Sequence, residues 1–553
     1  MNPHHNNKKV LNPLNALAAA LLAAGLVSPA FAQVAVPDAG RLNRELQEQP
    51  PAQPTPAPNL QLPAAAVEKV APGGLTVLIK QIQFSGNTVY TNEQLGQVLA
   101  QALNKSYDLA GLYNLAEAVS AFYREQGYSF AKVFVPEQGY AEGVLTLQVL
   151  EGKYGNIVVS AQDERHAQAA ERFLSPLKSG EPIYSPELER QVLLLDDQPG
   201  YDVNPVVKPG ATQGTGDLDV ALQRTPLVSG NVSINNHGNR YTGYLQARAN
   251  VFLNSLFQFG DQVSVTGLQS DEALTYGAVA YSLPLGSSGL RGTVGYSITD
   301  YELGREFANL QASGDAETVS VGVSYPFIRS RKANLTGSLS VLDKTFFDEQ
   351  RSVNSRVNRS SDATAVALNF DRTDDAGLSY GQLEWVQGDF NGPVPDAART
   401  NGSFSRVNYD LVRLQSATRR VSVYGRLNGQ WTGENLDSSE GFALGGPYAV
   451  RAYPTGEATG DKGLLAQLEL RFALSHTVSP FVFYDTGRIT VEADAVTPGL
   501  NSRSLSGLGL GVRYQSGPIG LELLAARRQS GGNSQTDPRN NSVMTWLLVR
   551  YSF

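Results

Sequence analysis

The amino-acid sequence predicts a transmembrane β-barrel in a bacterial outer membrane, preceded by two small α+β modules. First, residues from Ser229 to Phe553 alternate between apolar and polar in segments of about ten, as strands between lipid and a watery lumen do. Second, one order of strands and helices occurs twice between residues 75 and 225. Third, the chain begins with a secretory signal. These observations predict about sixteen antiparallel strands in the barrel.

Composition argues against several kinds of site. The 553 residues contain no cysteine, which excludes disulfides, thiolate metal sites and cysteine nucleophiles. The formal charge of -8 argues against a nucleic-acid partner. The mature chain keeps His166, His237 and His476, which have no acidic or histidine neighbour at metal-ligand spacing. We therefore expect no catalytic residue, metal or cofactor, and the lack of a phosphate-binding loop leaves no means of using ATP.

Residues 1–32 are predicted to be a signal peptide. Lys8 and Lys9 precede an apolar run from about Leu14 to Val27, and an A-x-A cleavage pattern ends at Ala32. The apolar run is shorter than the ~20 residues that a membrane-spanning helix needs, and no comparable run follows it. A membrane role for the mature chain therefore requires a closed β-barrel.

Residues 33–49 contain a short helical pattern, in which Leu42 and Leu46 lie four residues apart. A proline-rich linker, residues 50–74, follows this pattern and is expected to be extended. A short, mostly polar helix is unstable alone in water, so it must dock elsewhere on the protein or fray. The residues alone leave a disordered terminus as the alternative.

Residues 75–153 are predicted to fold as strand, helix, helix, strand and strand. Thr91 and Gln94 form a capping box at the start of the first helix, and Gly127 suits the left-handed end of the second. Residues 154–225 repeat this order of elements. We interpret the two segments as copies of one α+β module, and the alternative is a single irregular domain spanning both.

Residues 229–553 are predicted to form the barrel. In the clearest segment, Leu464 to Leu474, one side is apolar and the other carries Glu469 and Arg471. A soluble β-sandwich or β-solenoid also alternates, but its apolar faces must meet in a core. The signal peptide, the strand length, the even strand count and the aromatic end at Phe553 favour the barrel.

The strongest functional candidate is a long glycine-rich connection, residues 433–463. Its central motif consists of Val450, Arg451, Ala452 and Tyr453. A later strand carries three residues on one face: Phe483, Asp485 and Gly487. If the opposite face of that strand meets lipid, Asp485 projects into the lumen and suits a bidentate contact with Arg451 from an infolded loop. The alternative is that Arg451 is solvated at a loop tip, and the residues alone favour neither.

With these motifs the chain resembles the outer-membrane transporters of two-partner secretion, of the haemolysin-activator and filamentous-haemagglutinin transporter type. The resemblance covers essentially the whole mature chain. Its specific motifs are a V-R-G-Y loop tip, in which Ala452 here replaces the glycine, and an F-x-D-x-G strand, which Phe483 to Gly487 match fully. Because alanine disfavours positive φ, the loop turn is expected to differ slightly from that of the family.

The resemblance implies a sixteen-stranded barrel, two periplasmic polypeptide-transport-associated (POTRA) modules and an N-terminal plug helix. The modules would capture a large unfolded exoprotein, as an added strand on a sheet edge, and the barrel would secrete it without ATP. Arg451 would pair with Asp485, the helix with Leu42 and Leu46 would close the pore in the lipid bilayer, and the barrel-assembly machinery would read Phe553. The alternatives are a barrel-assembly or insertase protein of the same superfamily, a passive porin and an outer-membrane enzyme.

Overall fold

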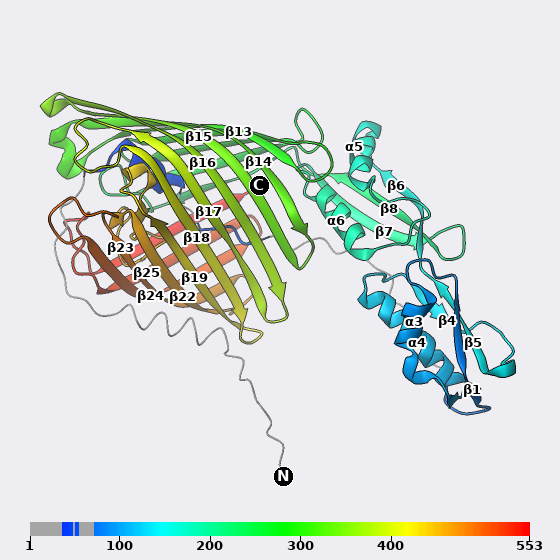
Figure 1. The fold of residues 1–553 in the computed structure, drawn as a ribbon. Helices are drawn as coiled ribbons and strands as arrows, with labels where there is room; N and C mark the ends of the chain where they lie inside the picture. Colours follow the sequence, from blue (N-terminus) through cyan, green and yellow to red (C-terminus); the bar gives the residue numbers. More distant parts are fainter. Residues whose placement is uncertain (1–35, 48–49, 55–70) are drawn as a thin grey trace, which may run out of the picture.

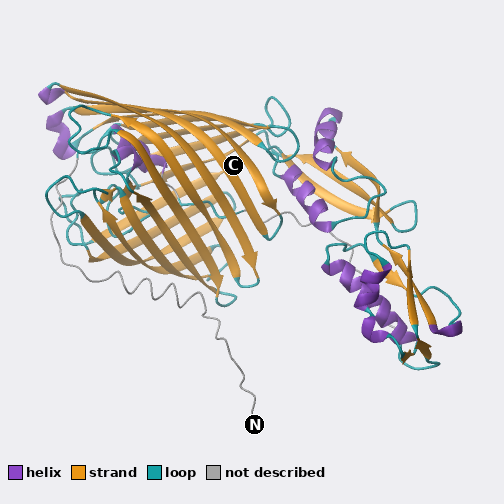
Figure 2. Ribbon diagram, in the orientation of Figure 1, coloured by secondary structure: helices purple, strands orange, loops and turns teal. Residues whose placement is uncertain are grey.

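The computed structural model describes residues 36–47, 50–54 and 71–553. The predicted signal peptide and most of the predicted linker lie outside the described residues. A closed barrel forms the larger part of the molecule, and two α+β modules follow one another beyond one of its ends (Figure 1). Figure 2 shows helices mainly in these modules, with short ones inside the barrel and at its other end. In the described residues, no helix has the length and apolar character needed to cross a membrane.

The first module is a three-stranded sheet covered by helices. Its elements are β1 (Val77–Ile79), β2 (Gln81–Ser85), α3 (Asn92–Val98), η1 (Ala100–Ala102), β3 (Lys105–Tyr107), α4 (Leu109–Glu125), β4 (Lys132–Phe134), η2 (Ala141–Gly143) and β5 (Val144–Leu150). Strand β5 lies between β2, to which it is parallel, and β4, to which it is antiparallel. The predicted capping box is confirmed, since Thr91 and Gln94 each bond the other's backbone amide. Gly127 has a φ of +94° just after α4, as its position predicts.

The second module repeats this topology. Its elements are β6 (Lys153–Ser160), α5 (Glu164–Leu174), α6 (Ser185–Asp196), β7 (Tyr201–Pro209) and β8 (Thr215–Arg224). Strand β8 is central, parallel to β6 and antiparallel to β7, as β5 is parallel to β2 and antiparallel to β4. The same order of elements therefore builds the same sheet twice, each with its own buried apolar core.

Within residues 71–553, sixteen antiparallel strands close into a barrel in which the last strand pairs with the first. They are β9 (Val228–Asn235), β10 (Gln246–Asn254), β11 (Gln262–Ser270), β12 (Leu274–Pro284), β13 (Arg291–Glu302), β14 (Ala312–Arg329), β15 (Ala333–Gln350), β16 (Ser355–Asp374), β17 (Gly377–Asn391), β18 (Gly402–Ser416), β19 (Val421–Thr432), β22 (Lys462–Phe472), β23 (Val478–Thr490), β24 (Ser502–Ser516), β25 (Ile519–Ser530) and β26 (Val543–Ser552). Their connections hold the short elements η3 (Arg305–Leu310), η4 (Arg351–Val353), η5 (Ser438–Glu440), β20 (Phe442–Ala443) and β21 (Thr459–Gly460). Helix α2 (Ala39–Gln47), from the N-terminal segment, lies in the lumen.

The alternation of side chains divides the barrel wall into two faces. On β22, Leu464 and Leu470 face outward and are 45% and 37% exposed, while Gln467 and Glu469 face the lumen and are buried. Outward apolar residues meet lipid, and inward polar residues meet water or each other. The predicted barrel is confirmed in strand number, closure and facing.

The second module is attached to the turns at one end of the barrel, beside α6 (Figure 1). Arg329, at the end of β14, forms a bidentate ion pair with Asp197, with both contacts at 2.7 Å. Phe259, in the turn between β10 and β11, stacks on Tyr201 of β7 with 4.7 Å between ring centroids. The resemblance implies that the modules are periplasmic, and this end of the barrel is then expected to be the periplasmic end.

A buried carboxylate ties the first module together. Glu151, 3% exposed, follows β5 and accepts hydrogen bonds from the amides of Thr88 and Val89 at 2.6 and 2.7 Å and from the Tyr123 hydroxyl at 3.0 Å. Burial acts to raise the pKa of the Glu151 carboxyl, but these hydrogen bonds outweigh it and hold the pKa below its ordinary value of 4.5. The ionised form is thus the one that stabilises the module.

Replacing Glu151 with Gln is expected to destabilise the first module by about 2 kcal/mol, because an amide presents donors to the donors of Thr88 and Val89. Because the folded pKa is depressed, the contribution is present above pH 4.5 and is lost as the pH falls through the folded pKa. Urea denaturation of residues 71–225 at pH 7 and in acid measures both effects. Tyr123→Phe, which removes one hydrogen-bond donor to Glu151, should lower the free energy of unfolding by less. If Glu151→Gln is as stable as the wild type, the ionised Glu151 carboxylate does not stabilise the module.

Candidate functional site in the barrel lumen

Helix α2 lies inside the barrel against its inner wall (Figure 1). Its side chains Leu42 and Leu46 are buried in an apolar cluster formed by β11 to β15 and the adjoining connections. The cluster partners of the helix are Tyr241, Leu268, Leu274, Tyr276, Tyr301, Leu303, Ala312, Ala316 and Phe346. Asn43 accepts a hydrogen bond from the Thr299 hydroxyl at 3.1 Å. The described helix, Ala39–Gln47, lies within the predicted segment 33–49 and docks in the lumen.

Arg359 on β16 binds the start of α2 to both the wall and the long connection. Its guanidinium lies 2.9, 2.7 and 2.7 Å from the carboxylates of Asp38, Asp348 and Asp437. Asp38 precedes the helix, Asp348 lies on β15 and Asp437 lies in the connection after β19. The Asp38 carboxylate also accepts the amide of Arg41 at 3.0 Å and so caps the helix. One arginine therefore joins three parts of the chain.

The connection between β19 and β22, residues 433–461, folds into the barrel, and we call it the lumen loop. Its central motif is buried, since Val450, Arg451, Ala452 and Tyr453 are each 3% exposed or less. The backbone turns sharply at this motif, where the Tyr453 amide donates to the Val450 carbonyl at 3.0 Å. The Tyr453 hydroxyl extends to the wall and donates to the Ser530 carbonyl at 2.8 Å.

Arg451, at the tip of the lumen loop, forms a bidentate ion pair with Asp485 on β23. Its Nε and Nη2 lie 2.8 and 2.7 Å from the two carboxylate oxygens, and its amide donates to the same carboxylate at 3.1 Å. Arg451 is 3% exposed and Asp485 is 0% exposed, so in this structure the guanidinium is buried in the ion pair and not solvated at a loop tip. Removing one partner of such a buried pair costs about 3–5 kcal/mol, because the other charge stays buried and uncompensated.

Each residue of the Phe483-x-Asp485-x-Gly487 motif contacts the lumen loop from the inward face of β23. The Phe483 ring lies against the Arg451 guanidinium, with 3.6 Å from Cζ to the ring centroid. Gly487 leaves room for the loop, because a Cβ there would lie 2.5 Å from a methyl group of Leu444. Because alternate residues of a strand share one face, the aromatic ring, the carboxylate and the position without a side chain form one inward-facing row.

Ala452 fits its position without backbone strain. Ala452 does not have a positive φ, so the steric penalty expected from replacing glycine does not arise here. Its methyl group packs on the bare backbone of Gly507 on β24, where an added Cβ would come within 2.3 Å of it. The alanine in the loop is therefore matched by a glycine in the wall.

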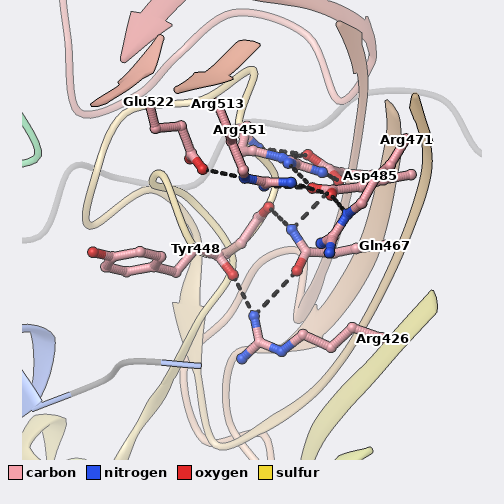
Figure 3. Close-up of polar contacts among 10 residues, drawn as sticks. Arg426, Tyr448, Arg451, Gln467, Arg471, Asp485, Arg513 and Glu522 are labelled. Atoms are coloured by element: carbon pink, nitrogen blue, oxygen red, sulfur yellow. Dashed lines mark hydrogen bonds and ion pairs between the residues drawn. The ribbon is translucent and has the colours of Figure 1, made fainter. Parts of the chain in front are cut away.

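A second carboxylate, Glu469 on β22, completes the charge balance around the loop tip. Arg451 Nη1 donates to Glu469, as do Arg471 at 2.7 Å and Arg513 at 3.0 Å. Arg513 also pairs with Glu522 on β25 (Figure 3). Three arginines thus meet three carboxylates across β22 to β25, which compensates the loss of hydration in the lumen.

Two further carboxylates hold the lumen loop on either side of its tip. Glu440, 1% exposed, lies 2.5 Å from Lys344 on β15 and 2.8 Å from Arg406 on β18. Glu457, 0% exposed, lies 2.6 Å from Arg503 on β24 and accepts backbone amides of the connection between β25 and β26. The loop is therefore bound to the wall at its tip and on both sides of the tip.

Sequence patterns did not single out Glu469, Glu440, Glu457 or Arg359. The predicted polar face of the segment 464–474 was a usable signal for Glu469, because it showed which way the side chain points. It could not show the partner, because the partners lie on other strands. For the other three residues no local pattern distinguishes a lumen ion pair from an exposed charge.

Phe553 lies where the barrel closes. Its amide and carbonyl each exchange a hydrogen bond of 2.9 Å with Gly230 on β9. Its side chain is 51% exposed, as are others on the outward face of β26 to a similar degree. The last residue of the chain thus lies at the junction of the first and last strands.

A polar cavity of about 410 Å³ remains between α2, the lumen loop and the opposite wall. Its lining includes Arg248 and Asn250 on β10 and Asn408 and Asp410 on β18. Such side chains can donate to and accept from the peptide groups of an extended chain. In the part of the chain that the structure describes, no group of three or more His, Cys, Asp or Glu residues could hold a metal ion.

Comparison with known proteins identifies the family. The haemolysin secretion/activation protein family ShlB/FhaC/HecB matches residues 214–514, and the ShlB-type POTRA domain matches residues 77–152. The heme/hemopexin transporter protein HuxB of Haemophilus influenzae (strain 86-028NP) is 26% identical over 531 residues, covering 91% of this chain and 93% of HuxB. The outer membrane transporter CdiB of Dickeya dadantii is 25% identical, covering 71% of this chain and 72% of its own.

Among solved structures, CdiB from Escherichia coli is similar with a TM-score of 0.72 and 20% sequence identity, covering 92% of this chain and 95% of that one. This likeness supports the fold, and the family match spans more than half of the 553 residues. The chain therefore belongs to the ShlB/FhaC/HecB family of haemolysin secretion/activation proteins, the outer-membrane transporters of two-partner secretion that carry POTRA domains in the periplasm.

Proposed function

We propose that the periplasmic modules capture a large unfolded exoprotein and that the barrel passes it to the cell surface without ATP. The observation that carries this proposal is a lumen filled by two separable segments, α2 and the lumen loop, rather than by the wall's own side chains. Barrels of 16–18 strands enclose an aqueous channel when nothing fills them. Family membership favours secretion over the alternatives of an insertase or a passive porin.

Helix α2 acts as the resting plug. Its polar contacts include the Arg359 to Asp38 pair and a hydrogen bond from Arg41 to the Gly456 carbonyl, and Leu42 and Leu46 are its larger apolar anchors. A nine-residue helix does not persist alone in water, so release converts it into an unfolded tether.

The modules bind the exoprotein through strand edges. Each sheet has a central strand, β5 or β8, flanked by edge strands whose outer backbone groups can pair with another chain. Main-chain hydrogen bonds do not depend on side-chain identity, which suits an unfolded protein. The Arg329 to Asp197 pair holds the second module beside the periplasmic turns, so a bound chain would be presented at the entrance of the barrel.

The lumen loop holds the strands that it contacts in place while the exoprotein passes. Folding of the exoprotein outside the cell draws the rest of the exoprotein chain outward. The barrel-assembly machinery reads the C-terminal strand that ends at Phe553, and the outward apolar face contacts outer-membrane lipid. No step requires a catalytic group, because transport through a channel breaks no covalent bond.

Secretion itself is tested by comparing the proteins released by cells with and without this chain. Mass spectrometry of the medium should show one or a few large polypeptides lost when the chain is absent, with the same polypeptides retained in the periplasm. Restoring the wild-type chain should restore their release. An unchanged set of released proteins would contradict the proposal.

Arg451→Ala is expected to reduce secretion to background while the barrel still assembles. Arg451 takes no part in strand pairing, but its loss removes the loop-tip anchor and leaves Asp485 unpaired, at about 3–5 kcal/mol. Released exoprotein and heat-modifiable gel mobility measure the two effects. Arg399→Ala is the matched control, since Arg399 pairs with Asp494 at 3.2 Å on the surface, where such pairs contribute little. Normal export by Arg451→Ala would overturn the anchor role.

Deleting residues 37–49 is expected to raise ion conductance in planar bilayers, because α2 no longer fills the lumen. Asp38→Asn is a milder test. Asparagine still caps the helix but loses the charge that Arg359 contacts, so the open fraction should rise roughly tenfold for a loss of about 1.5 kcal/mol. If conductance after the deletion equals that of the wild type, α2 is not the plug.

A further inference from the structure

The outer surface of the barrel carries an apolar groove of about 730 Å³ over β22 to β25. It follows one row of strand pairing, in which Leu470, Val482, Leu510 and Ala525 face outward on β22 to β25. Ala525 is the smallest of these side chains and leaves the row hollow on β25. The volume lies in the ~300–1,000 Å³ range of small-molecule pockets.

The outward residues change character at one level of the wall. On β24, Leu508 and Leu510 are followed, toward the end of the barrel away from the modules, by Ser506, Ser504 and Ser502. A transmembrane barrel presents an apolar band to lipid, and its upper edge on β24 is therefore at Leu508. Beyond that edge lies the headgroup region of the outer leaflet.

Arg527 on β25 lies at this boundary. It pairs in register with Leu508 on one side and with Val543 on the other, and it lines the end of the groove. Its side chain is exposed, and among the described residues none forms an ion pair or hydrogen bond with it. The neighbouring Arg528 instead faces the other way and donates to Asn540 at 2.6 Å. An outward arginine beside lipid is costly unless it meets an anion.

We propose that this groove binds a phosphorylated glycolipid of the outer leaflet, with an acyl chain along Leu470, Val482, Leu510 and Ala525 and a phosphate on Arg527. The position of Arg527 at the surface-side edge of the apolar band selects the outer leaflet, whose lipid A carries phosphates on a sugar headgroup. A guanidinium binds phosphate with paired, charge-assisted hydrogen bonds. The bound lipid would fix β22 to β25, the strands that hold Arg471, Asp485, Arg513 and Glu522 in the lumen.

The test uses the full-length protein in detergent with bisphosphoryl lipid A, and native mass spectrometry counts the lipid retained. The wild type should retain one lipid A, and Arg527→Gln should bind about tenfold more weakly because one charge-assisted contact is lost. Dephosphorylated lipid A should bind wild type and Arg527→Gln equally weakly. Ala525→Phe, which fills the groove from the lipid side, should abolish retention of lipid A. Heat-modifiable gel mobility should confirm that each variant barrel is folded.

Arg419→Gln is the matched control, because Arg419 is an exposed arginine in the turn between β18 and β19 at the periplasmic end. It should leave lipid A binding unchanged. The proposal is overturned if Arg527→Gln binds as the wild type does, if Arg419→Gln weakens binding equally, or if Ala525→Phe has no effect. If phosphatidylglycerol is retained as well as lipid A is, the occupant is a phospholipid and not the glycolipid. If the protein forms a dimer that Ala525→Phe disrupts, the occupant is a second copy of the chain.

Discussion

The buried guanidinium of Arg451 needs opposite charges and hydrogen bonds around it, and the arrangement of the lumen depends on supplying them. Burying a charge is costly unless opposite charges and hydrogen bonds replace water. Asp485 and Glu469 supply the charges, Phe483 supplies a ring face and Trp546 donates to the Arg451 carbonyl at 2.8 Å. These groups lie on three strands, β22, β23 and β26, so the loop tip satisfies Arg451 only where the closed barrel brings them together.

The lumen loop in turn forms part of the binding site of the plug helix. Gly40 of α2 approaches η5 so closely that a Cβ on it would lie 2.8 Å from that of Ser439. Arg359 contacts Asp38 of the helix segment and Asp437 of the loop with the same guanidinium. The position of the loop and the binding of the plug are therefore energetically linked, because moving either one leaves Arg359 with fewer carboxylates.

The same alternation of side chains gives the wall two chemically different surfaces. On the inward face, β22 and β23 carry side chains that bind the lumen loop, including Glu469 and Asp485. Facing outward, Leu470 and Val482 of the same strands line an apolar groove. Because the two sets alternate along the same strands, the strand positions that place the loop anchor inside also place the apolar row outside.

Sequence by itself determined the local structure and the facing of residues. Short-range rules account for the capping box at Thr91, the left-handed Gly127, the repeated module and the barrel strands, because each depends on neighbours a few residues away. The Phe483 to Gly487 spacing also indicated an inward row. Only the tertiary structure decided which charges meet. Arg359 and Asp38 are far apart in the chain, as are Glu440 and Lys344, and docking of α2 and of the lumen loop inside the closed barrel brings each pair within contact. Periodicity shows the face on which a side chain lies, but its partner depends on the register of strands across the barrel.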